Sequence, residues 1–241
     1  MLEQAGFEVT ERLEPSYEVD DGEAIGTEPV AGSRAEAGAQ VTMRVATRPS
    51  ECNDIGTVPD SSFTDLGGLD AAAQDAVHWA VDVGLISEDT RFNPTTASTR
   101  GVAVTVLHRY MCEPTVGTSD FDDVLRGAFY TAAIDWAAST GVVSGTSSGQ
   151  FKPDDNITRA EFVTIVWRAF GQQRATDSLP FDDVPSSAFY RNALRWAYGN
   201  GIINGTSATT FDPSGELDRV TLVVLFDRIE RLIDPLVGPF D

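Results

Sequence analysis

Three arginines stand at matching places in the chain and offer anion-binding chemistry. Arg100, Arg159 and Arg219 occur in the segments STRG, ITRA and LDRV, each at the expected start of a helix. A planar guanidinium holds a carboxylate through two parallel hydrogen bonds, and free N–H groups at a helix N-terminus add to the attraction. The pattern predicts binding of an acidic ligand. The alternative is pairing with carboxylates of the chain itself, and at Arg219 we expect the adjacent Asp218 to compete.

The strongest of these sites is expected at Arg159. Thr158 and Glu161 form a T-x-x-E capping box around it, and Lys152, the only lysine in the chain, precedes it by seven residues. Lys152 and Arg159 are therefore expected to face one acidic group. We expect the change Arg159→Ala to weaken ligand binding at least ~10-fold and to leave the thermal midpoint nearly unchanged.

Aromatic and small residues extend the candidate site. One tryptophan occurs in each of the segments HWA, DWA and RWA, namely Trp79, Trp136 and Trp196. Each lies on the apolar stripe of an expected helix, so it either packs in the core or forms the wall of a sugar groove. The pairs Gly145-Thr146 and Gly205-Thr206 either offer backbone N–H and hydroxyl groups to a ligand or form a turn after a helix.

Catalytic and metal chemistry find less support. The pairs Asp122–Asp123 and Asp182–Asp183 resemble acid/base carboxylates, but their repetition before a helix favours a capping or structural role. His78 and His108 have no His or Cys partner at ligand spacing, and no calcium-loop pattern occurs. We therefore expect no metal, no cofactor and no enzymatic activity.

The overall charge excludes several partners. The 241 residues carry 17 basic and 37 acidic side chains, a formal charge of −20. Such a chain lacks the basic face of a nucleic-acid binder and the cationic patch of an anionic-membrane binder. No stretch approaches the ~20 apolar residues that cross a bilayer. Because the same charge repels an anionic polymer at long range, binding must depend on local arginine clusters, on neutral sugar contacts or on cation bridging.

An internal repeat must position these residues. The Phe of FTDL or FDDV, the Trp, the F-x-P motif and the Arg recur in the same order three times, with successive arginines 59 and 60 residues apart. Each unit predicts two helices: in the second unit the first carries Phe129 and Trp136 on its apolar stripe and ends at Gly141. A two-helix unit buries little alone. We predict a mainly α domain in which three units pack around a common axis, with pseudo-threefold symmetry.

The predicted organisation has six parts. Residues 1–48 read as a small α+β piece that ends in the strand Val41–Val45, and residues 49–60 as a linker. The three repeats cover residues 61–117, 118–177 and 178–234, and residues 235–241 form a tail.

The threefold pattern F-D-D-V, W-A, G-x-x-x-G-T, F-x-P and I-T-R-A-E resembles the S-layer homology family, most clearly at FKPDDNITRAEF in the second repeat. Repeats one and three depart from it, with TRGV and DRVT in place of TRAE. The first fifty residues are similar to a partial PASTA module. The resemblance implies a three-pronged helical spindle. It also implies a non-catalytic anchor that binds secondary cell-wall polysaccharide, often pyruvylated, in grooves between the prongs. Because one chain already supplies all three repeats, we expect a monomer.

In that family the arginine of T-R-A-E contacts the acidic ketal, and PASTA modules imply peptidoglycan contact. Both place the protein outside the cell at the wall. The start, which shows no signal peptide, is then interpreted as truncated. An oxidising location agrees with a disulfide between Cys52 and Cys112, against the alternative of two buried thiols. A structural scaffold for protein partners and part of a peptidoglycan hydrolase remain as alternative functions.

Overall fold

The computed structural model describes residues 7–15, 24–29, 33–34, 38–47, 62–87, 89–115, 117–146, 149–175 and 178–233. The chain divides into two compact units, Met1–Cys52 and Asn53–Asp241, and each is described by itself.

The first unit contains a three-stranded sheet. Its strands β1 (Glu8–Pro15), β2 (Ala24–Glu28) and β3 (Gln40–Thr47) lie in the order β1-β3-β2. The pairing of β1 with β3 is parallel and that of β2 with β3 antiparallel. The strand expected at Val41–Val45 is therefore present, as part of β3. The expected linker at 49–60 lies outside the described residues.

The second unit is helical, and the prediction of a mainly α fold is confirmed. The first helices of the three successive pairs are α1 (Ala71–Asp82), α3 (Thr131–Ser139) and α5 (Arg191–Gly199). The second helices are α2 (Arg100–Tyr110), α4 (Arg159–Ala169) and α6 (Arg219–Ile233).

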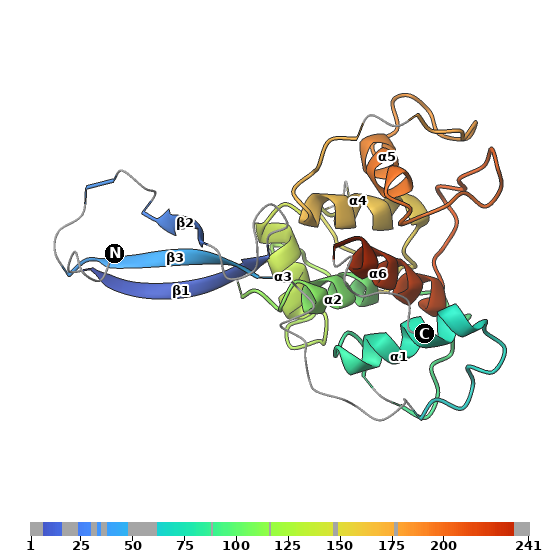
Figure 1. Cartoon of the computed structure of the whole chain (residues 1–241), viewed down its shortest axis with the longest axis horizontal. Helices are drawn as coiled ribbons and strands as arrows, with labels where there is room; N and C mark the ends of the chain where they lie inside the picture. The colour runs from blue at the N-terminus through green and yellow to red at the C-terminus, as the bar shows by residue number, and fades with distance from the viewer. Residues whose placement is uncertain are drawn as a thin grey trace. The chain divides into compact units, whose positions relative to one another are not determined.

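Neighbouring helix pairs exchange contacts around a closed ring (Figure 1). α3 packs against α2, α5 against α4, and α1 against α6. Each first helix thus covers the second helix of the preceding pair, and the first pair closes onto the last. Because no pair buries its apolar face within itself, the three pairs depend on one another for stability.

Main-chain hydrogen bonds close the same ring at its centre. The N–H of Ser98 donates to the carbonyl of Leu217 at 2.7 Å, that of Leu217 to Ile157 at 3.2 Å, and that of Ile157 to Ser98 at 2.9 Å. Each residue directly precedes an N-cap, Thr99, Thr158 or Asp218. The three second helices therefore start around one pseudo-threefold axis.

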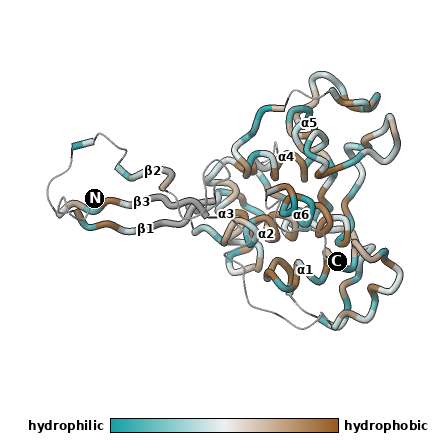
Figure 2. Tube along the Cα trace, viewed as in Figure 1, coloured by the Kyte–Doolittle hydropathy of each residue, from teal (hydrophilic) through white to brown (hydrophobic). Residues whose placement is uncertain are grey.

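Aromatic side chains from the three second helices fill the interior. Tyr110 of α2 and Phe162 of α4 both contact Phe226 of α6, at ring-centroid distances of 5.4 and 5.7 Å. All three are essentially buried, and the Tyr110 hydroxyl donates to the buried Glu230 carboxylate at 2.7 Å. Hydrophobic residues gather along α1 and α2 (Figure 2).

Local signals placed the helix ends well, with one exception. The predicted capping box of Thr158 and Glu161 is present, and Gly141 follows α3 in the left-handed conformation, with φ 77°. Phe129 was predicted on the apolar stripe of the first helix, and this is wrong. The helix begins only at Thr131, and the Phe129 side chain is 65% exposed.

Candidate functional site

The three candidate arginines each hold the F-x-P loop of the next repeat. Their Nε groups donate to the carbonyl of a buried phenylalanine, and each guanidinium stacks over the ring of that same phenylalanine. The Nε–O distance is 2.9 Å for Arg100 with Phe151, 2.9 Å for Arg159 with Phe211 and 2.7 Å for Arg219 with Phe92. In the same order, the guanidinium carbon lies 4.8, 4.6 and 5.0 Å from the centroid of the phenylalanine ring. The arginines therefore join repeats one to two, two to three, and three to one.

The expected helix-terminus anion site is wrong. The N–H of Arg159 donates to the carbonyl of Gly215 at 2.8 Å, and that of Ala160 to Pro213 at 3.0 Å. The third amide of the helix, Glu161, donates to the Thr158 hydroxyl at 3.3 Å. Because equivalent bonds occupy the first two amides of α2 and α6, an anion can meet only the guanidinium groups.

The aspartate at the third position of each FTDL or FDDV segment holds the F-x-P loop of its own repeat. Its two carboxylate oxygens accept the N–H groups of the loop phenylalanine and the following residue, at 2.7–2.8 Å, in Asp65, Asp123 and Asp183. These amide bonds, led by Phe92, outweigh burial and lower the pKa of Asp65. The structural interpretation of the aspartate pairs therefore describes these carboxylates, although they hold a loop rather than cap a helix.

The structure does not bring Lys152 and Arg159 to one site. Lys152 lies on the loop that Arg100 contacts, and its ammonium lies 3.4 Å from the carboxylate of Asp155. Arg159 instead donates to carbonyls of the third repeat, Phe211 and Asn204. The expected pair fails because each arginine reaches forward to the next repeat.

Two of the three tryptophans pack inside. Trp136 and Trp196 are 5% and 3% exposed, and their rings contact His108 and Phe170 at 5.3 and 5.8 Å. Neither ring offers a face to a ligand, so the core interpretation holds for them. Trp79 is only partly buried.

The Gly-Thr pairs shape turns. A Cβ added at Gly145 or Gly205 would overlap the ring of the F-D-D-V phenylalanine in the same repeat. The N–H groups of Thr146 and Thr206 donate to main-chain carbonyls four residues later, at 2.7 and 2.9 Å. Their backbone amides are thus used within the fold.

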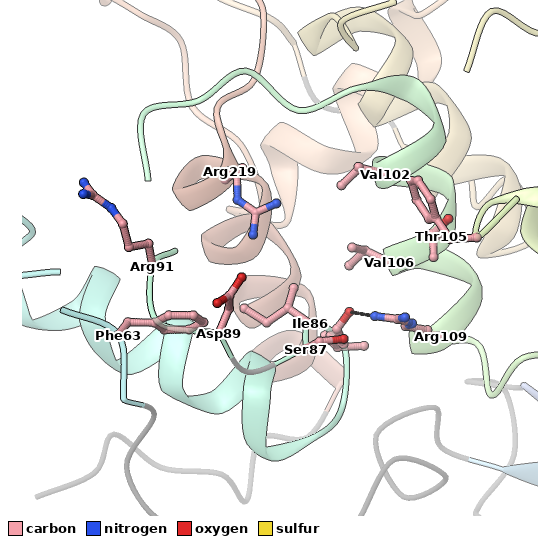
Figure 3. A pocket seen from close by; sticks show the side chains of 12 residues that line it. Phe63, Ile86, Ser87, Asp89, Arg91, Val102, Thr105, Val106, Arg109 and Arg219 are labelled. Atoms are coloured by element: carbon pink, nitrogen blue, oxygen red, sulfur yellow. Dashed lines mark hydrogen bonds between the residues drawn. The ribbon is translucent and has the colours of Figure 1, made fainter. Parts of the chain in front are cut away.

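Two matching grooves combine all three repeats. The first groove, of about 280 Å³, is lined by Phe63, Leu85, Ile86, Ser87, Asp89, Arg91, Val102, Thr105, Val106, Arg109, Phe129 and Arg219 (Figure 3). The second groove, of about 310 Å³, is lined by Arg100, Val143, Ser144, Gly145, Glu161, Thr164, Ile165, Arg168 and Phe189.

Most residues that line the two grooves occupy equivalent positions in their repeats. Each has one repeat-joining arginine, Arg219 or Arg100, and one exposed phenylalanine, Phe129 or Phe189, from a further repeat. Their floors are the helices α2 and α4. At the third position of these helices the first groove has Val102, whereas the second has a glutamate.

This difference decides the state of the two arginines. Arg100 forms an ion pair with Glu161. Among the described residues, no hydrogen bond or ion pair occupies the terminal nitrogens of Arg219. Burial lowers the pKa of Arg219, and the nearby Asp65 and Asp89 offset this in part, so the guanidinium stays charged. In Figure 3 this guanidinium lies between α6 and the Asp89 carboxylate.

Sequence reasoning missed two groups that line the grooves. Phe129 was expected on the buried stripe of a helix, and the equivalent Phe189 was not singled out. Arg109 and Arg168 donate to carbonyls of the groove walls, Leu85 at 2.9 Å and Val142 at 3.3 Å. Their common signal is an arginine nine residues after each repeat-joining arginine, a spacing that α6 repeats.

Several other expectations concern absences or undescribed residues. Cys112 follows α2, but Cys52 lies outside the described residues, so the disulfide stays a prediction. Within the described ranges, no group of three or more His, Cys, Asp or Glu side chains is arranged to hold a metal ion. No helix there combines the length and the apolar character needed to cross a membrane.

Comparison with curated proteins finds cell-surface relatives. The chain is 28% identical over 180 residues, 72% of its length, to the surface-layer 125 kDa protein of Lysinibacillus sphaericus. It is 30% identical over 165 residues, 62% of its length, to cell surface glycoprotein 1 of Acetivibrio thermocellus. It is 26% identical over 182 residues, 71% of its length, to the amylopullulanase of Thermoanaerobacterium thermosulfurigenes. The aligned regions span only 15%, 7% and 10% of these relatives.

Comparison with protein families finds two matches. Residues 120–163 and 180–219 match the S-layer homology domain. The matched segments include the F-D-D-V motifs, the helices α3 and α5 and the starts of α4 and α6. The two matched segments lie within the second and third predicted repeats. The first repeat and the PASTA-like piece stay predictions that rest on the sequence pattern.

Proposed function

We propose that this chain is a non-catalytic anchor that binds secondary cell-wall polysaccharide at the bacterial surface, with an acidic group of the polymer held by Arg219 in the first groove. The observation that carries the proposal is the state of this side chain. Its Nε and one face of its guanidinium contact Phe92, whereas its two terminal nitrogens border a groove and form no hydrogen bond or ion pair with the described residues. A guanidinium edge of this kind suits a carboxylate such as a pyruvyl ketal.

Local charge supports this choice over the rest of the surface. Three arginines and one aspartate line the first groove, in a chain whose formal charge is −20. Arg91 and Arg109 have carboxylates nearby, at 3.7 Å in Asp65 and 3.9 Å in Glu113, but these pairs are partly or largely exposed and weak. The groove is thus a local cationic site that an anionic polymer reaches within the screening length of ~8 Å at physiological salt.

The relatives support an anchoring role. Two of them are named as surface proteins, and in the amylopullulanase the matched region covers only 10% of the protein. A region shared by surface proteins and an enzyme suits a common attachment function rather than a common reaction. Closure of the ring within one chain also supports a monomer. Peptidoglycan contact by the first unit belongs to the same proposal.

Calorimetry on the whole chain tests the proposal. The probes are a purified pyruvylated wall polysaccharide, the same polymer after mild-acid depyruvylation, and peptidoglycan stripped of polysaccharide. We expect binding of the pyruvylated polymer that weakens with added salt and is at least ~10-fold tighter than binding of the depyruvylated one. No binding to any probe would overturn the proposal in favour of a protein scaffold, and release of soluble peptidoglycan fragments would favour the hydrolase.

A further inference from the structure

The second groove has the same architecture as the first but a different chemical character. Its arginine, Arg100, donates through Nε to the carbonyl of Phe151 and is ion-paired through a terminal nitrogen with Glu161. The Arg100 side chain is largely buried, so water screens this ion pair only in part. An incoming anion would have to displace a carboxylate that is already in place.

Glu161 is fixed from two sides. One carboxylate oxygen pairs with Arg100, and the other accepts the N–H and the hydroxyl of Thr158 at 2.9 and 2.8 Å. The capping box of α4 therefore holds this carboxylate in the groove. In the first groove Val102 occupies the equivalent position, so the box there is incomplete and offers no carboxylate to Arg219.

An exposed aromatic ring borders the second groove. Phe189 is 68% exposed, and its ring stands edge-on against Tyr190 at a centroid distance of 5.2 Å and an interplanar angle of 87°. Because Tyr190 is buried, it gives the exposed ring a firm support. A phenyl face offers apolar contact to the C–H side of a sugar ring, and a nearby carboxylate and hydroxyl can bond its hydroxyl groups.

We infer that the second groove binds an uncharged sugar residue of the same polymer, stacked on Phe189 and hydrogen-bonded by the Arg100–Glu161 pair and Ser144. The inference rests on the proposed function and divides the polymer between two grooves, an acidic residue in the first and a neutral residue in the second. The charge balance argues for this occupant, because an ion pair with both signs satisfied recognises hydroxyl groups without attracting net charge. The volume of about 310 Å³ is at the lower end of ligand sites.

The variant Phe189→Ala tests whether a sugar residue stacks on the exposed phenylalanine ring. We expect it to lower affinity ~10-fold for the pyruvylated and the depyruvylated polymer alike, because both contain the neutral residue. Leu125→Ala is the matched control, since Leu125 is 69% exposed and lines neither groove. Thermal melts of both variants should match the parent protein.

The variant Glu161→Gln tests the charge assignment by a gain of binding. Glutamine preserves the capping box but releases Arg100 from its carboxylate partner. We expect affinity for the pyruvylated polymer to rise ~3- to 10-fold while affinity for the depyruvylated polymer stays level or falls.

The outcomes separate this inference from the proposed function. If the parent chain binds no polymer, the proposed function fails. If it binds but Phe189→Ala binds both polymers as the parent does, the second groove is not a sugar site and the inference alone fails. Loss confined to the pyruvylated polymer in Phe189→Ala, or no gain in Glu161→Gln, overturns the neutral assignment.

Discussion

The first and second grooves show how one architecture gives two chemical sites. Both place an arginine, a helix floor and an exposed phenylalanine around a space of about 300 Å³. At the third helix position a valine in one and a glutamate in the other decide whether the arginine is available. A residue usually interpreted as part of a helix cap therefore determines, in this fold, whether the arginine of the neighbouring repeat is available to a ligand.

The largest expected effect comes from comparing Arg219→Ala with Arg100→Ala. Two charge-assisted hydrogen bonds to an acidic ligand, each worth ~1.5–3 kcal/mol, are lost only in the first variant. We expect calorimetry to give at least ~30-fold weaker binding of the pyruvylated polymer for Arg219→Ala and less than ~3-fold for Arg100→Ala. Both variants lose the same contact with a loop phenylalanine, and Arg100→Ala also loses the ion pair with Glu161. Thermal melts therefore serve as the control that both variants are folded at the temperature of the binding measurement. Equal losses of affinity would refute the difference between the grooves.

A transplanted carboxylate should give the next largest effect. Val102→Glu places a glutamate opposite Arg219 and completes a capping box with Thr99, which supports folding. We expect affinity for the pyruvylated polymer to fall ~10-fold. Val102→Gln, which completes the box without charge, should bind nearly as the parent chain does. If the two variants behave alike in calorimetry, charge is not what distinguishes the grooves.

A third comparison separates stability from binding. Arg159 lines neither described groove, yet its guanidinium holds the carbonyls of Phe211 and Asn204. Hydrogen bonds from charged groups contribute ~1.5–3 kcal/mol each, so Arg159→Ala should lower the free energy of unfolding by about 1–3 kcal/mol in urea titrations. This replaces the expectation from sequence of an unchanged midpoint. An unchanged urea midpoint would contradict a role of Arg159 in holding the second and third repeats together.

The smallest expected effect is a pH dependence of stability that originates at His108 on α2. Burial lowers the pKa of His108 below its usual value of 6.5, Arg109 acts in the same direction, and the Pro114 carbonyl and Glu113 oppose it. As the pH falls below 6.5, the unfolded chain takes up a proton that the native state does not, so stability decreases towards the folded pKa. The equivalent residue on α4 is Trp167. His108→Gln should therefore reduce the loss of thermal midpoint between about pH 7 and about pH 5, and an equal loss in both proteins would contradict this origin.

The sequence by itself determined the repeat, the helix pairs and most helix ends. These depend on signals between residues close in the chain: the capping box of Thr158 and Glu161, the glycine after α3 and the apolar spacing along α4. Such interactions form within one or two turns of a helix, so their sequence pattern is sufficient.

Only the tertiary structure decided which residues meet in a groove. Arg100, Arg159 and Arg219 contact loops 51, 52 and 127 positions away, and no local pattern states that each arginine reaches the next repeat. Because each arginine contacts the next repeat, Lys152 and Arg159 lie at different sites and Glu161 pairs with Arg100. For the same reason the terminal nitrogens of Arg219 remain available to a ligand. Phe129 and Phe189 are exposed because they precede α3 and α5, which begin at Thr131 and Arg191, so helical spacing does not apply to them.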